Sequence, residues 1–103
     1  MVNCAGILHS QTTWDEQVIH PLSSFNRVFD INVTGTFNFC RFGANAMRNN
    51  VPNEKGERGA IVNISSIAGA EGRMEEIAYG PSKGAVNGMT LPMARDLSRF
   101  GIR

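Results

Sequence analysis

The sequence predicts an α/β fold: a βαβαβ segment of a doubly wound parallel sheet, with the N-terminal and C-terminal strands of such a sheet missing. Two observations predict it. Short runs of β-favouring apolar residues alternate with longer runs whose apolar residues recur every three or four positions. In addition, 103 residues are few for a complete doubly wound domain, so we expect one partial domain over 1–103.

The first expected element is a buried strand over residues 1–4, which are largely apolar and are followed at once by Ala5 and Gly6. An apolar run that ends in a glycine is typical of a strand that enters a loop. Residues 7–21 show only weak periodicity. We expect them to cross the top of the sheet as a loop with about one helical turn, and to form the rim of a pocket.

A helix in two pieces is expected next, capped by the hydroxyl of Ser23 or Ser24. Its apolar residues recur at spacings of three and four, at Phe25, Val28, Phe29, Ile31, Val33, Phe37, Phe39, Phe42, Ala46 and Met47. The polar stretch 48–59 interrupts this pattern and is expected to be an exposed connection.

The second strand is expected over residues 60–64, a short apolar run typical of a strand that is buried on both faces. Ser65 and Ser66 follow at its carboxyl end. After a glycine-containing loop, helical spacing begins near Ile77 and continues to about Arg99. Gly101 stops this helix, and Ile102 is expected to begin a further strand.

Composition excludes several functional classes. The formal net charge is +1 and the charges are scattered, so we expect neither a nucleic-acid partner nor an anionic membrane surface. No apolar run is long enough to span a bilayer, and no targeting segment is visible, so a soluble intracellular protein is expected. Cys4 and Cys40 are expected to be buried free thiols of a reducing compartment rather than metal ligands. His9 and His20 are expected at the surface.

The residues that carry chemistry follow the strands. Ligands of open parallel sheets bind beyond the carboxyl ends of the strands, where Gly6 and Ser66 stand in this chain. Tyr79 and Lys83 are four residues apart on the next helix and therefore lie about 6 Å apart on one face. Because Pro81 is tolerated in the first helical turn and is costly further in, the helix is expected to start within a few residues of Tyr79.

A tyrosine in this place is suited to acid–base chemistry. The positive end of the helix dipole and the ammonium group of Lys83 both favour the phenolate form of Tyr79. Such a group could exchange a proton with an alcohol or a carbonyl, and Ser66 could hydrogen-bond the same oxygen. A Tyr and a Lys at this spacing are, by themselves, more often a solvated surface pair. The preceding strand and Ser66 favour a catalytic pair over a surface pair here.

Four short motifs occur in a fixed order along nearly the whole chain. They are Asn3-Cys4-Ala5-Gly6, Asn32-Val33-Thr34-Gly35, Ser66, and Tyr79-x-x-x-Lys83. In order and approximate spacing they resemble the short-chain dehydrogenase/reductase family. The resemblance implies a partial Rossmann-like fold and an oxidoreductase that transfers a hydride between NAD(P) and a secondary alcohol or ketone. NAD is the expected cofactor of the two.

The resemblance also implies roles for individual residues. Tyr79 would be the acid/base, Lys83 would favour its phenolate and hold the nicotinamide ribose, and Ser66 would position the substrate oxygen. Asn32 would hold a water in a proton relay from Lys83 to solvent, although it could merely bond a neighbouring carbonyl. The cofactor cleft would be lined by Asn3, Cys4, Ala5 and Gly6. Because the family usually has Asn at the position of Cys4, only a backbone contact is expected there.

A narrower resemblance comes from residues 88–97, Gly-Met-Thr-Leu-Pro-Met-Ala-Arg-Asp-Leu, from the Asn-Cys-Ala-Gly start and from the long polar loop before Ala60. These resemble the type 2 3-hydroxyacyl-CoA dehydrogenase branch, also known for 17β-hydroxysteroid activity. That branch implies fatty acid metabolism, a small-molecule substrate, a homo-oligomer formed through the long helices, and a mitochondrial rather than cytoplasmic location.

One alternative stays open from the sequence. The 103 residues contain no G-x-G-x-x-G turn to hold a pyrophosphate, so the isolated chain is expected to be unable to turn over substrate. The alternative to the oxidoreductase is therefore a catalytically inactive fragment that acts only as an interaction or remnant protein.

Overall fold

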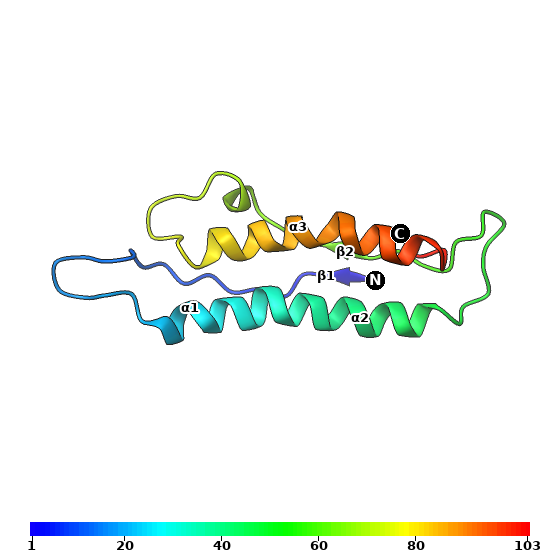
Figure 1. The fold of residues 1–103 in the computed structure, drawn as a ribbon, viewed down its shortest axis with the longest axis horizontal. Helices are drawn as coiled ribbons and strands as arrows, with labels where there is room; N and C mark the ends of the chain where they lie inside the picture. Colours follow the sequence, from blue (N-terminus) through cyan, green and yellow to red (C-terminus); the bar gives the residue numbers. More distant parts are fainter.

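Two short parallel strands form the centre of the structure, a computed structural model that describes residues 1–103 (Figure 1). Strand β1 (Val2–Asn3) pairs in parallel with β2 (Val62–Asn63). On the other edge of β2, a parallel bridge between Gly59 and Ile102 begins a third strand. The predicted parallel sheet and βαβαβ order are confirmed, although regular pairing covers fewer residues than the apolar runs suggested.

A continuous helical segment follows the first loop. It consists of α1 (Leu22–Phe29), a π-helical stretch over Asp30–Gly35, and α2 (Thr36–Met47). The predicted cap by Ser23 or Ser24 is wrong, because the helix begins at Leu22 and no side chain caps it. The preceding Pro21 is already extended, and its carbonyl accepts the first amide hydrogen bonds of the helix.

The second long helix, α3 (Tyr79–Ser98), begins at Tyr79, as Pro81 predicts, rather than at Ile77. Figure 1 shows α3 running alongside the α1–α2 segment, with the strands between them in this view. The molecule is elongated as a result, with extents of 60 × 23 × 18 Å. None of its helices combines the length and the apolar composition needed to cross a bilayer.

The sheet is covered on one face only, so the prediction of a strand buried on both faces is wrong. Asn63 accepts a hydrogen bond from Cys40 of α2 and lines a small cavity with residues of α3, so both helices lie on the side of the sheet that Asn63 faces. Val2, Val62 and Ile64 point away from the helices and are 57%, 48% and 48% exposed. Successive right-handed crossovers between adjacent strands place their helices on the same face.

The expectation for the histidines is wrong in part, since His9 and His20 are both half-buried rather than at the surface. Their rings pack edge to face at 5.8 Å between centroids. His20 also lies within hydrogen-bond distance of the carbonyl of Thr12, at 3.2 Å. The pair therefore stiffens the loop that precedes α1.

The two cysteines differ, which corrects the expectation that both are buried: Cys40 is buried and Cys4 is exposed. Burial raises the pKa of the Cys40 thiol above its usual value, although its hydrogen bond to Asn63 opposes this.

Because the thiolate is the reactive form, we expect a thiol reagent near neutral pH to label Cys4 at least about tenfold faster than Cys40. Peptide mass spectrometry over a labelling time course measures both rates. In denaturant the two rates should converge, and equal rates in the folded protein would contradict the structure.

Candidate active site

Four of the predicted site residues, Gly6, Asn32, Tyr79 and Lys83, come together beyond the carboxyl ends of β1 and β2. Gly6 marks the meeting point, because a Cβ atom built on it would lie 3.3 Å from both Asn32 Oδ1 and Lys83 Nζ. The loop after β1, the π-helical stretch and the first turns of α3 therefore meet at one place. Gly6 carries no side chain, and this leaves open the space beside the Lys83 ammonium group.

Asn32 is held on three sides and is only 1% exposed. Its Oδ1 accepts the amide hydrogen of Ile7 at 2.8 Å, and its Nδ2 donates to the Ile7 carbonyl at 2.9 Å and to Ser82 Oγ at 3.0 Å. The π-helical stretch adds a residue to the turn that carries Asn32, and such local widenings are frequent at functional sites. Asn32 thereby ties the loop after β1 to α3.

Lys83 is 6% exposed, and its Nζ donates to the carbonyl of Ile64 at 2.9 Å. The same Nζ lies 5.8 Å from the centroid of the Tyr79 ring. The two side chains therefore share one face of α3, as their spacing predicts. A buried ammonium group with only one protein hydrogen bond has further donors to offer to a ligand.

Ser66 ends the segment that follows β2. Its Oγ accepts the amide hydrogen of Ala68 at 3.2 Å and so caps the short 3₁₀ turn Ile67–Gly69. Accepting that bond leaves the hydroxyl hydrogen free for a ligand oxygen. The turn packs closely on α3, since a Cβ atom on Gly69 would lie 2.8 Å from the backbone nitrogen of Gly84. This packing fixes Ser66 relative to the helix that carries Tyr79.

The expected cofactor-lining residues at the end of β1 divide into two kinds. Asn3 is buried, and its side chain donates to Thr36 Oγ1 at 2.9 Å and lies within 3.3 Å of the Ala5 amide. Asn3 therefore connects the loop after β1 to the start of α2. Cys4, Ala5 and Gly6 are exposed, so their backbone is accessible to a ligand.

Two further serines also belong to this region: Ser65, which the sequence places at the end of the second expected strand, and Ser82, to which it does not point. Ser65 Oγ donates to the carbonyl of Lys83 at 3.0 Å, and Ser82 Oγ donates to the carbonyl of Tyr79 at 2.7 Å. Ser82 is the neighbour of Lys83, and this adjacency was the only sequence signal that could have found it.

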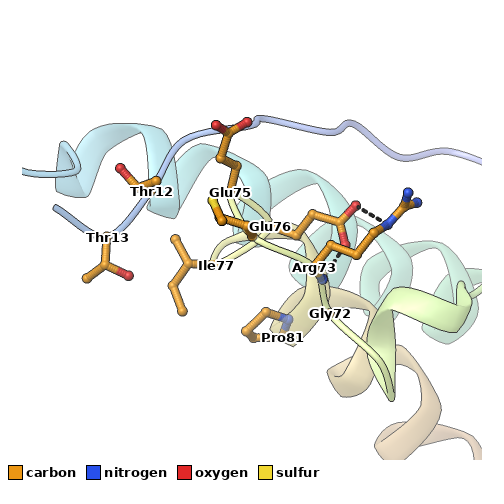
Figure 2. A pocket seen from close by; sticks show the side chains of 9 residues that line it. Thr12, Thr13, Gly72, Arg73, Glu75, Glu76, Ile77 and Pro81 are labelled. Carbon is orange, nitrogen blue, oxygen red and sulfur yellow. Dashed lines mark hydrogen bonds and ion pairs between the residues drawn. The ribbon is translucent and has the colours of Figure 1, made fainter. Parts of the chain in front are cut away.

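A cavity of about 330 Å³ lies beside the start of α3, between the loop before α1 and the loop before α3 (Figure 2). Its lining includes Thr12, Thr13, Met74, Ile77 and Pro81. This placement agrees with the expectation that residues 7–21 form the rim of a pocket.

Hydrogen bonds connect the two loops that border this cavity. The amide of Gln11 donates to the carbonyl of Glu75 at 2.9 Å. Glu75 adopts a left-handed φ of 68°, which is uncommon for a residue other than glycine. Figure 2 shows Glu76 turned toward Arg73, with the carboxylate and guanidinium groups 3.7 Å apart. The two loops that form the rim are therefore held by a backbone hydrogen bond between them and by an ion pair within the second loop.

Comparison with known proteins places this geometry in context. A family model described as "short chain dehydrogenase" matches residues 1–103. A Drosophila melanogaster 3-hydroxyacyl-CoA dehydrogenase type-2 is 50% identical over 104 residues, covering 99% of this chain and 41% of the relative. The chain thus spans about two fifths of that relative's length.

Two solved structures are also similar. A Mycobacterium avium 3-hydroxyacyl-CoA dehydrogenase type-2 superposes with a TM-score of 0.93 at 36% identity, over 99% of this chain and 40% of that one. ElxO with NADP bound superposes with a TM-score of 0.79 at 35% identity, over 99% of this chain and 38% of that one.

Proposed function

The chain belongs to the short-chain dehydrogenase family, and from this premise we propose that it is the acid–base part of a nicotinamide-dependent oxidoreductase that interconverts a secondary alcohol and a ketone. The observation that carries the proposal is the convergence of Asn32, Lys83 and Gly6 beside Tyr79. A buried ammonium beside a phenol ring, at the mouth of a parallel sheet, is suited to moving a proton at a ligand oxygen.

Each residue has a proposed role, and Lys83 has two. During alcohol oxidation, the Tyr79 oxygen takes the hydroxyl proton of the substrate, and during ketone reduction it returns a proton to the carbonyl oxygen. Ser66 donates its free hydroxyl hydrogen to the same substrate oxygen. Lys83 stabilises the negative charge on Tyr79 and bonds the cofactor ribose, and Asn32 holds a water that carries the proton onward to solvent.

The residues present fit a nicotinamide cofactor. The backbone of Cys4, Ala5 and Gly6 is exposed, and a side chain at position 6 would fill the space beside Lys83 Nζ. The cofactor, when bound, supplies or accepts the hydride at its nicotinamide ring. No G-x-G-x-x-G turn occurs in the 103 residues, so we propose that its phosphates are held by residues outside this chain.

We propose a 3-hydroxyacyl-CoA as the substrate, because several relatives bear the name 3-hydroxyacyl-CoA dehydrogenase. A hydroxysteroid is the second candidate. The cavity beside α3 is large enough for part of either molecule, and although Thr12, Thr13, Arg73, Glu75 and Glu76 make much of its lining polar, Met74, Ile77 and Pro81 offer contacts to a hydrocarbon portion.

We further propose that residues 1–103 form one partial catalytic domain of a mitochondrial homo-oligomer that assembles through its long helices. Phe37, Phe39 and Phe42 of α2 and Leu91 of α3 support this assembly, since all four are more than two fifths exposed. Large apolar side chains on a helix surface are characteristic of interfaces.

The proposal is tested by steady-state turnover of the complete protein with NAD and with NADP, on a 3-hydroxyacyl-CoA, a hydroxysteroid and a simple secondary alcohol. We expect kcat/KM with NAD to exceed that with NADP by at least about tenfold, a difference of about 1.4 kcal/mol. The 3-hydroxyacyl-CoA should be the best substrate. If a folded protein shows no turnover with either cofactor, the oxidoreductase assignment fails and the inactive interaction protein replaces it.

A further inference from the structure

Ser82 stands directly before Lys83 in α3 and is fully buried, with 0% exposure, although none of the roles above includes it. It has two polar partners. Its hydroxyl lies 2.7 Å from the carbonyl oxygen of Tyr79 and 3.0 Å from Nδ2 of Asn32. It is therefore the one side chain hydrogen-bonded both to Asn32 and to the backbone of Tyr79.

The direction of these bonds follows from the inventory of donors. A serine hydroxyl has a single hydrogen, and a backbone carbonyl can only accept. The hydrogen of Ser82 must therefore point to the Tyr79 carbonyl, which turns the oxygen lone pairs toward Asn32. Only the NH₂ end of the Asn32 amide satisfies them.

This choice agrees with the direction that the Ile7 backbone imposes on the Asn32 amide, whose Nδ2 also donates to the Ile7 carbonyl at 2.9 Å. With its nitrogen toward Ser82, its oxygen faces the amide hydrogen of Ile7, from which it accepts a bond at 2.8 Å. The reversed amide would set two donors against each other at Ile7. The oriented oxygen also lies beside Gly6, since a Cβ atom built on Gly6 would be 3.3 Å from this oxygen and 3.3 Å from Lys83 Nζ.

We propose that Ser82 is a positioning residue for the acid–base site. It anchors the Asn32 amide, which the Ile7 backbone orients, to α3, and its bond to the Tyr79 carbonyl fixes the first turn of that helix, which carries Tyr79 and Lys83. The inference rests on the proposed function, since its main effect is on turnover.

The first test is Ser82→Ala in the complete protein. Misplacing reacting groups by about 1 Å costs about 10²-fold in rate, so we expect kcat to fall by roughly 10- to 100-fold while KM for the alcohol stays within about threefold. Ser82→Thr keeps the hydroxyl and should recover most of kcat. A kcat for Ser82→Ala within about twofold of wild type would overturn the inference.

Ser98→Ala is the matched control. Ser98 makes the same kind of bond in the same helix, from its hydroxyl to the carbonyl three residues earlier, at 2.8 Å, but it is exposed at the far end of α3. We expect this variant to keep kcat within about twofold, because losing one exposed helical bond alone changes little. A loss of kcat equal to that of Ser82→Ala would mean that the effect comes from weakening the helix and not from positioning the site.

A double-mutant cycle with Asn32→Ala isolates the route of the effect. If Ser82 acts through Asn32, then Ser82→Ala should lower kcat by less than about threefold in the Asn32→Ala background. Independent multiplication of the two losses would contradict this route. Should Ser82→Ala not fold, Ser82→Cys, which has nearly the same volume and a weaker donor, takes its place in the same cycle.

Nuclear magnetic resonance of the Asn32 side-chain amide separates this inference from the proposed function. Ser82→Ala should shift that signal and speed its hydrogen exchange, whereas Ser98→Ala should leave it unchanged. An unshifted signal would overturn the inference whatever the enzyme does. If Ser82→Ala shifts the signal but the wild-type protein shows no turnover, only the oxidoreductase proposal is overturned.

Discussion

Replacing Tyr79 by phenylalanine should remove nearly all turnover from the complete protein. Positioned acid–base groups typically contribute 10²- to 10⁴-fold to a rate, and we expect a loss of about 10³-fold, or roughly 4 kcal/mol of transition-state stabilisation. The loss should appear in kcat and in kcat/KM alike, because proton transfer takes place only in the transition state. Steady-state kinetics with saturating cofactor measures both.

The change is conservative for everything except the hydroxyl group. Phenylalanine keeps the ring whose centroid lies 5.8 Å from Lys83 Nζ, and no hydrogen bond of the Tyr79 hydroxyl to another residue is present. Cofactor affinity should therefore stay within about threefold, and the unfolding midpoint should change little. Retained turnover in Tyr79→Phe would refute the acid–base role. A large loss of cofactor affinity would instead point to a packing role.

Gly101→Ala should have the largest effect on folding. Gly101 has a φ of 70°, and an added Cβ would overlap the carbonyl oxygen of Gly56. The left-handed conformation costs alanine about 1–2 kcal/mol, and the overlap also forces apart a loop held by a 2.7 Å bond from the Arg58 amide to the Gly101 carbonyl. We expect a loss of more than about 3 kcal/mol in the free energy of unfolding, measured by urea denaturation of the complete protein.

Gly56→Ala separates the two causes. Gly56 also has a positive φ, 80°, but an added Cβ there meets nothing within 4 Å. Its substitution should cost about 1 kcal/mol, the backbone contribution alone. If both variants lose the same free energy, then the contact between Gly101 and Gly56 does not constrain the fold as described.

The chain's local signals predicted the elements that depend on them. Pro81 predicted that α3 starts within a few residues of Tyr79, because a proline costs least in the first turn of a helix, and the helix begins at Tyr79. The spacing of Tyr79 and Lys83 likewise predicted a shared helix face, which the 5.8 Å approach of the ammonium group to the ring confirms. Both features are set by a few adjacent residues.

Features that depend on tertiary contacts were missed. Periodicity could not locate the π-helical turn, because one added residue changes the apolar spacing little and the stretch surrounds Asn32, which is bonded to the distant Ile7 and Ser82. The prediction that Val62 and Ile64 are buried was wrong, because an apolar run does not tell whether one face or two faces of a strand are covered. Ser82 was missed because a serine inside a helix carries no signal until its partners are known.

The most direct test of the central claim is label transfer from the reduced form of the nicotinamide cofactor, deuterated at the carbon that donates the hydride. The complete protein would be incubated with this cofactor and a 3-ketoacyl-CoA, and the product analysed by mass spectrometry. We predict deuterium on the carbinol carbon of the product, at a rate that Tyr79→Phe lowers by about 10³-fold. Folded protein that binds the cofactor but transfers no label to this or a steroid ketone would contradict the account.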